Sequence, residues 1–295
     1  MVTISIIGVG RVGGAIALAV PKDKYSLDNL VFRNTPINDE GLRSLLLPGH
    51  AVPFAEIGSI TSDVVFITTQ DAEIANVSKS LVGKISSNSI VFHTCGAQSS
   101  SVLDDLKGAG CRTGSVHPLV SVSSPELGPS RFKGAYFCVE GHMDAVSTGK
   151  EIVADLGGNP FAIDTKFKTL YHASAVTACG HLVALFDASV EMMTKCGLSA
   201  EVSKEILLPL VASTVQNLRE QTTSGALTGT FARADIETFT QHLTALNQYV
   251  SDDLLEIYLL LGERSLELAA TQGVSPDRIE TLRTKVSVAK SKLKW

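Results

Sequence analysis

The sequence contains few cysteines, and their spacing disfavours two common uses of this residue. Its 295 residues include five cysteines, and no two of them form a C-x-x-C pair. An odd number without paired spacing disfavours a disulfide framework, and the chain shows no His/Asp/Glu cluster with the spacing of metal ligands. We therefore expect no metal site, and reduced thiols at Cys95, Cys111, Cys138, Cys179 and Cys196.

Positive charge is not in excess either. Twenty-five Lys and Arg residues stand against 30 Asp and Glu, which leaves a net charge of −5. Nucleic-acid-binding domains generally carry a basic surplus. No charged segment followed by a cleavable apolar run is present, and the apolar N-terminal stretch is interrupted by Arg11 and glycines. We expect a cytoplasmic protein that acts on a small molecule and binds neither nucleic acid nor a membrane.

What the chain does have, at its very start, is a glycine-rich turn between a strand-like and a helix-like segment. In such a turn the first glycine permits the tight bend, the second lets the backbone approach a pyrophosphate, and the third lets helix and strand pack closely. The N–H groups of the helix N-terminus then face the anion. We expect a dinucleotide to bind at Gly8, Val9, Gly10, Arg11, Val12 and Gly13.

The next apolar strand indicates which dinucleotide. It spans 30–32 and ends in Arg33, Asn34 and Thr35, where an NAD site generally has an acid for the ribose 2′-OH. A guanidinium instead accommodates a 2′-phosphate, and Arg11 can add a second positive charge. These residues favour NADP, although both arginines could also be solvated surface residues.

Apolar strand-like runs alternate with helical stretches through the first half of the chain, which predicts a parallel sheet covered on both faces. The expected strands span 3–7, 30–32, 63–68, 89–94, 114–117 and 135–139, with a short edge strand at 51–54. Ligands bind at the carboxyl ends of such strands. This selects Thr68, Thr69 and Gln70 for the cofactor, and Thr94, Cys95, Gly96 and His117 nearer to the substrate. Serine and threonine at strand ends can also simply satisfy backbone groups.

The pattern changes near residue 165, after which helical periodicity dominates. Asp164 or Thr165, Ser199, Asp235, Ser251 and Ser275 are suitable helix caps, and Gly197 and Gly273 are suitable ends. We therefore expect an α/β fold with a dinucleotide-binding Rossmann domain at 1–164 and an all-helical domain at 165–295. The many apolar helices favour a homodimer through the second domain, and the active site is expected in the cleft between the domains.

Several longer motifs carry a family resemblance over essentially the whole chain. They are Gly8 to Gly13, Ser115 to Leu119, Phe137 to Gly141, Lys168 to Ala175, and Leu227 to Asp235 with His242 and Leu243. The chain resembles oxidoreductases in which a Rossmann-like domain precedes a helical domain of unknown function. These are related at greater distance to ketopantoate reductases, pyrroline-5-carboxylate reductases and the 6-phosphogluconate dehydrogenase-like superfamily. The family usually carries asparagine where this chain has Gly180, so no role is transferred to that position.

The resemblance implies that Lys168 polarises and protonates a substrate carbonyl, as a lysine on the corresponding helix does in the distant dehydrogenases. His172 follows at i+4 on the same helical face, and its imidazole suits general acid catalysis, as does that of His117. Arg233 suits bidentate binding of a substrate carboxylate. The alternatives are an exposed first-turn lysine, structural histidines, and an ion pair of Arg233 with Asp235 or Glu237. His93 and His181 are expected to be packing residues.

Three functions remain open. The first is reduction of a small 2-oxo acid, such as a ketopantoate-like substrate, with NADPH. The second is reduction of a cyclic imine such as pyrroline-5-carboxylate, or of a deazaflavin. The third is an NADP-binding sensor without catalysis, which would need the glycine turn but neither Lys168 nor His172.

Overall fold

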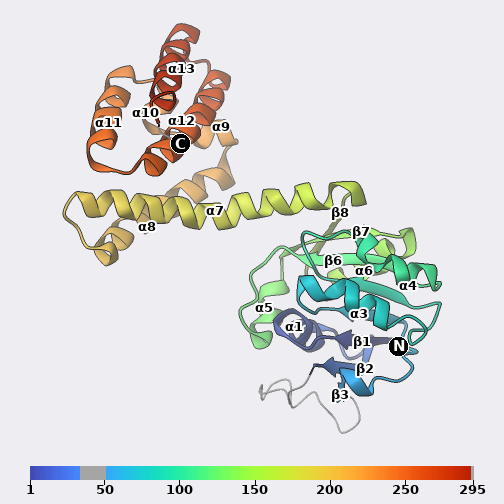
Figure 1. The fold of residues 1–295 in the computed structure, drawn as a ribbon. Coiled ribbons are helices and arrows are strands. Elements are labelled where there is room, and N and C mark those ends of the chain that lie inside the picture. Colours follow the sequence, from blue (N-terminus) through green and yellow to red (C-terminus); the bar gives the residue numbers. More distant parts are fainter. Residues whose placement is uncertain (34–50, 294–295) are drawn as a thin grey trace. The chain divides into compact units, whose positions relative to one another are not determined.

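The computed structural model describes residues 1–33 and 51–293, so Asn34 and Thr35 lie outside the described residues. The chain divides into two compact units, residues 1–177 and 178–295. We call them the sheet unit and the helical unit and describe each by itself (Figure 1).

The sheet unit is built on one eight-stranded sheet with the strand order β3-β2-β1-β4-β5-β6-β7-β8. Its strands are β1 (Val2–Ile7), β2 (Tyr25–Phe32), β3 (Ala51–Pro53), β4 (Val64–Ile67), β5 (Ile90–His93), β6 (Arg112–Pro118), β7 (Tyr136–Gly141) and β8 (Asn159–Ala162). β3 lies at the edge, as its proline predicts, because proline cannot donate a ladder hydrogen bond. From β3 to β6 in this order, neighbouring strands all pair parallel.

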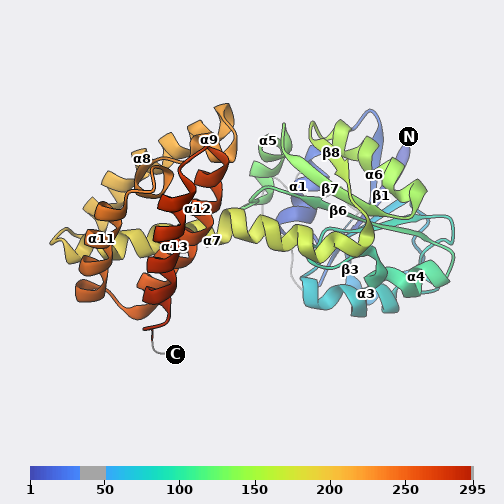
Figure 2. The ribbon, with the colours of Figure 1, turned by 90° about the horizontal axis from the view of Figure 1, so that it is seen from above.

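Neighbouring residues of the central strands face two separate cores. Val64 and Phe66 of β4 pack into one core, whereas Val65 and Ile67 pack into the other. This alternation explains why the strands read as continuous apolar runs, since both of their faces are buried. Helices cover the first core on one side of the sheet and the second on the other (Figure 2). They are α1 (Arg11–Ala19), α5 (Gly128–Phe132) and α6 (Met143–Asp155) on one face, and α3 (Ile74–Ser80) and α4 (Asp104–Gly108) on the other.

The expectation of a purely parallel sheet is wrong at one edge. β7 pairs antiparallel with β6, and β8, which the sequence pattern did not indicate, pairs parallel with β7. The chain between β6 and β7 contains α5, which packs against α1: a Cβ at Gly128 would lie 2.1 Å from that of Ala15. β7 therefore starts at the edge of the sheet where β6 ends, and its first residues lie beside that carboxyl end.

The helical unit has the caps that the sequence predicts. Side chains of Ser199 and Asp235 accept the N–H groups of Val202 and Thr238, and Gly197 and Gly273 adopt left-handed backbones with φ of 90° and 82°. The helices are α7 (Lys168–Lys195), α8 (Ala200–Glu220), α9 (Thr223–Ala226), α10 (Gly229–Ala232), α11 (Ile236–Tyr249), α12 (Asp252–Thr271) and α13 (Pro276–Lys290). A one-turn 3₁₀ helix (Thr165–Phe167) precedes α7, which begins in the sheet unit and continues into the helical unit.

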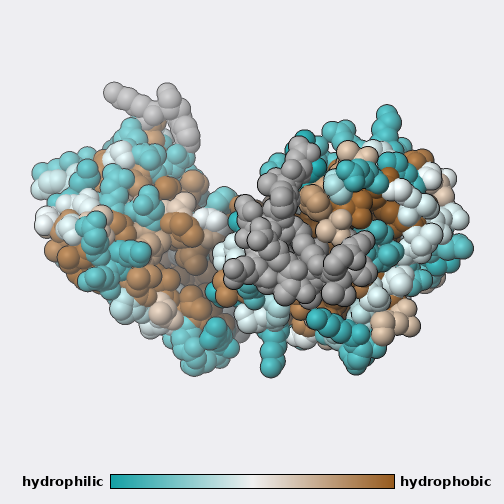
Figure 3. All heavy atoms as spheres, turned by 90° about the horizontal axis from the view of Figure 1, so that it is seen from below, coloured by the Kyte–Doolittle hydropathy of each residue, from teal (hydrophilic) through white to brown (hydrophobic). Residues whose placement is uncertain are grey.

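Within the described residues, one segment, Thr165–Lys195, is long and apolar enough to cross a membrane by length and composition. Only 6% of its most apolar window is buried. Its neighbour α8 also exposes apolar side chains, among them Ile206 and Leu210 (Figure 3 shows apolar surface on the helical unit).

Candidate active site

The glycine turn between β1 and α1 is held against the end of β4. Gly8 has a φ of 102°, a left-handed conformation that favours glycine, and the Thr68 hydroxyl donates a 2.6 Å hydrogen bond to its carbonyl. A Cβ at Gly13 would lie 2.3 Å from Thr68 Oγ1 and 2.5 Å from the Gly8 carbonyl oxygen. Two of the three glycines are thus required by close packing.

The remaining glycine leaves room for a ligand. A Cβ at Gly10 would meet nothing within 4 Å, and Gly10 occupies the N-cap of α1 without a side-chain cap. The first turn of α1, whose N–H groups have no partner within the helix, therefore begins beside space that the described residues leave open, as a pyrophosphate site requires. Thr69 adds a buried hydroxyl oxygen with no partner among the described residues. Together these features fit a dinucleotide.

Two exposed arginines lie at the ends of elements next to the glycine turn, at the start of α1 and after β2. Arg11 opens α1 and Arg33 follows β2, and within residues 1–33 and 51–293 neither forms an ion pair with a carboxylate. Gln70 is exposed just beyond β4. The arginines are therefore available to an anionic ligand.

Lys168 is buried rather than exposed, with an exposed fraction of 1%. Its ammonium donates a 2.7 Å hydrogen bond to Ser115 Oγ on β6 and lies 5.3 Å from the centre of the Tyr171 ring. Burial lowers the pKa of Lys168, although Cys138 and Glu140 act in the opposite direction. This geometry rules out the alternative of a solvated first-turn lysine.

Two half-buried imidazoles lie near this lysine. The rings of His117, at the end of β6, and His172, in the second turn of α7, are 5.7 Å apart in an edge-to-face arrangement. His117 Nδ1 is 2.7 Å from the Tyr171 hydroxyl, and His172 Nδ1 is buried without a partner among the described residues. Three sequence-predicted residues, Lys168, His172 and His117, thus come together at one place.

Gly96 lies directly against both imidazoles. A Cβ there would be 2.4 Å from His172 Nδ1 and 2.7 Å from His117 Nε2. Thr94 and Cys95 precede it after β5, and burial raises the pKa of the Cys95 thiol. Cys95 is therefore poorly suited to act as a nucleophile.

A third histidine lies inside the protein. His93 is fully buried, as expected of a packing residue, and its Nδ1 accepts the Cys95 N–H. Its Nε2 therefore carries the proton, and this nitrogen has no partner in the described part of the chain. Burial, followed by the charge of Lys168, lowers the pKa of both His93 and His117 to about 3. Both imidazoles are neutral near pH 7, and Lys168 supplies the positive charge.

A buried carboxylate fixes the start of α7. Glu140 on β7 is 1% exposed and accepts hydrogen bonds from the Ser100 N–H and hydroxyl, and from the Thr165 hydroxyl at 2.7 Å. It lies opposite Ser115 in the β6–β7 register. The Glu140 side chain therefore connects strand β7 by hydrogen bonds to two other segments, the one that follows β5 and the turn that precedes Lys168.

Sequence reasoning gave no role to Glu140, Ser115 or Tyr171. All three belong to the quoted motifs, and two of them carried a usable signal: Tyr171 lies at i+3 from Lys168 on α7, and Ser115 lies two residues before His117 on the same face of β6. His181, expected to be a packing residue, is instead exposed on α7, as is Gly180.

Arg233 is exposed in the helical unit, where the described residues form no ion pair with it. Ala234 beside it is buried with a φ of 44°.

Comparisons with known proteins agree with this architecture. Residues 1–118 match the Rossmann-like domain family, and residues 135–265 match a domain of unknown function (DUF2520). Curated proteins gave no match to the sequence.

Solved structures share the fold across both units. A Thermotoga maritima protein is 22% identical, with a TM-score of 0.72 over 91% of this chain and 99% of its own. Pyrroline carboxylate reductase from Plasmodium falciparum, solved with NADP bound, is 14% identical, with a TM-score of 0.54 over 91% and 98%. A reductive aminase from Aspergillus terreus, solved with NADPH and ethyl levulinate, is 16% identical, with a TM-score of 0.55 over 99% and 94%.

Proposed function

The chain belongs to the proteins that join a Rossmann-like domain to the DUF2520 domain, and from this premise we propose that it is an NADP-dependent oxidoreductase that reduces a small 2-oxo acid. The observation that carries the proposal is the cluster of His117 and His172 around Gly96 beside the buried ammonium of Lys168. This cluster lies in the same unit as the open glycine turn, at the carboxyl ends of β5 and β6.

Each side chain of the cluster has its own role in the proposed reaction. When bound, NADPH supplies the hydride. Lys168 holds a positive charge that stabilises the negative charge developing on the carbonyl oxygen. His172, which is half-exposed, donates a proton to that oxygen and regains one from solvent. His117, neutral and held by Tyr171, orients the carbonyl.

Reduction of an imine is the second candidate. It is supported by the shared fold of the pyrroline carboxylate reductase and the reductive aminase. An imine nitrogen is more basic than a carbonyl oxygen, so this reaction depends less on Lys168.

The test follows the absorbance of reduced nicotinamide with a panel of 2-oxo acids and cyclic imines. We expect turnover with 2-oxo acids, lowered about 10²-fold or more in the His172→Asn variant, the scale of a lost general acid. Exposed His242 in the helical unit, changed to asparagine, is the matched control. NADPH binding without any turnover would instead support a sensor.

We expect the Arg33→Ala variant to bind NADPH about tenfold more weakly and NADH nearly unchanged, because Arg33 is an exposed cation where the 2′-phosphate is expected and forms no ion pair within residues 1–33 and 51–293. Fluorescence titration of both cofactors measures the two dissociation constants. Arg219→Ala, an exposed arginine of the helical unit, controls for loss of charge. Equal losses for both cofactors would overturn the assignment of NADP.

We propose further that the protein is a homodimer through the helical unit. α7 and α8 expose Val183, Ile206 and Leu210 by 70, 50 and 64%. Such apolar faces are typical of subunit interfaces. Sedimentation is expected to show a dimer that Leu210→Glu dissociates, whereas Val288→Glu, on half-exposed Val288 of α13, leaves it intact. A monomeric wild-type protein would overturn this proposal.

A further inference from the structure

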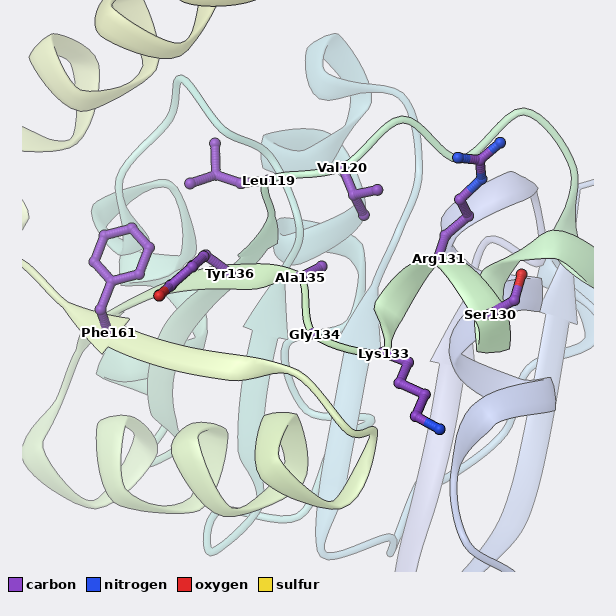
Figure 4. Close-up of a pocket in the computed structure, with 9 residues that line it drawn as sticks. All are labelled: Leu119, Val120, Ser130, Arg131, Lys133, Gly134, Ala135, Tyr136 and Phe161. Carbon is purple, nitrogen blue, oxygen red and sulfur yellow. The ribbon is translucent and has the colours of Figure 1, made fainter. Parts of the chain in front are cut away.

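An open pocket of about 560 Å³ lies at the edge of the sheet where β6 ends and β7 begins. It belongs entirely to the sheet unit, and none of the residues expected to bind cofactor or substrate lines it. Leu119 and Val120 follow β6, Gly134 and Ala135 precede Tyr136 of β7, and the end of α5 closes one side (Figure 4).

The two sides of the pocket differ in chemistry. Figure 4 shows the rings of Phe161 and Tyr136 on one side and Arg131 on the other. Tyr136 is 60% exposed, which is high for an aromatic residue in a strand, and its ring centre is 6.4 Å from that of Phe161. Among the described residues no carboxylate forms an ion pair with Arg131. An aromatic surface and a guanidinium that no described carboxylate pairs with thus share one pocket.

Aromatic contacts connect this pocket to the histidines. The centre of the Phe161 ring is 5.9 Å from that of the Tyr171 ring, in an edge-to-face arrangement. The Tyr171 ring centre is in turn 5.8 Å from that of His117, and the Tyr171 hydroxyl is hydrogen-bonded to His117 Nδ1. In addition, Leu119 is only two residues beyond His117. Phe161, which lines the pocket, is therefore linked to His117 by ring contacts through Tyr171.

We propose that this pocket binds the far end of the substrate, and that the substrate is a 2-oxo acid with an aromatic ring that ends in a second carboxylate. The ring packs against Tyr136 and Phe161, because aromatic rings favour edge-to-face or offset contacts. The distal carboxylate binds Arg131, whose planar guanidinium matches it with two parallel hydrogen bonds. This inference rests on the proposed reductase function and adds the class of substrate.

The test compares pyruvate, phenylpyruvate and 4-carboxyphenylpyruvate as substrates of the full-length protein with NADPH. We expect kcat/KM to rise in that order. In the Arg131→Gln variant, the ratio of kcat/KM for 4-carboxyphenylpyruvate over phenylpyruvate should fall about tenfold, the scale of a charge-assisted pair at an open site. Tyr136→Ala should lower the ratio of phenylpyruvate over pyruvate by a similar factor.

The matched control is Arg112→Gln. Arg112 is an exposed arginine at the opposite end of β6, paired with Asp144, and its change should leave both ratios unaltered. If the three substrates react equally, or if Arg131→Gln and Arg112→Gln have the same effect, the pocket does not bind the substrate.

A binding measurement separates this inference from the proposed function. Terephthalate carries the ring and the carboxylate but cannot be reduced as a 2-oxo acid, and calorimetric titration reports its affinity for the NADP-loaded protein. Binding that Arg131→Gln weakens supports the pocket even if no 2-oxo acid turns over, in which case only the proposed reaction fails. Terephthalate binding that is absent, or equal in both variants, overturns the pocket.

Discussion

Replacing Gly96 by alanine is expected to lower kcat/KM at least about a hundredfold. The new Cβ would lie 2.4 Å from His172 Nδ1 and 2.7 Å from His117 Nε2, so both imidazoles must move. Displacing a catalytic group by about 1 Å is enough for an effect of this size. The glycine turn is a separate segment held by Thr68, so the NADPH dissociation constant should change little.

The control for this experiment is Gly58→Ala, since a Cβ at Gly58 meets nothing within 4 Å. Thermal unfolding of both variants distinguishes a displaced site from a damaged fold, because overpacking a buried position costs about 1–3 kcal/mol, which a protein of this size withstands. A Gly96→Ala protein that retains most of its turnover would show that the substrate does not react between these histidines.

Local chemistry explains which parts of the fold the sequence predicts. The turn at Gly8 and the cap at Asp235 depend on one residue and its immediate neighbours, and both form as expected. The antiparallel β7 depends instead on how the chain around Gly128 packs against Ala15, 113 positions away in the sequence. Such packing leaves no periodic signal in the sequence, so the apolar pattern predicts a parallel strand where β7 pairs antiparallel with β6.

The residues of the candidate site are likewise of two kinds: some are predictable from local spacing, and others are brought together only by the fold. Lys168 and His172 share one helical face and were recognisable as a pair from their spacing. Ser115, which accepts the hydrogen bond from Lys168, lies 53 residues before it. Glu140 looks like an ordinary strand residue, because only the folded chain shows that its side chain is buried among Ser100 and Thr165. Partners of this kind are fixed by tertiary contacts, which explains why a single sequence did not reveal them.

Changing Lys168 to methionine is expected to raise the pKa of two other residues, His93 and His117. Burial is the largest cause of their low pKa values of about 3, and the charge of Lys168 is the second. Removing the ammonium leaves burial in place, so both pKa values rise without reaching the ordinary value of about 6.5. Nuclear magnetic resonance titration of the histidine ring protons measures this directly, with Lys166→Met as the control, because the exposed Lys166 lies beside Asp164 and the Phe167 ring and contacts neither histidine.

The same substitution changes how stability depends on pH. In the unfolded chain these histidines bind a proton near pH 6.5, whereas in the folded protein they bind it only near pH 3. The unfolded state therefore binds more protons across this interval, and the free energy of unfolding falls as the pH is lowered through it. The Lys168→Met protein should lose less stability between pH 6.5 and 4 than the wild type, as measured by denaturant unfolding at each pH.

The Lys168→Met protein should also lose about 10²-fold in kcat, because the charge that stabilises the developing oxyanion is gone. Unchanged histidine titrations together with retained turnover would show that Lys168 serves only to hold α7 to β6 through Ser115.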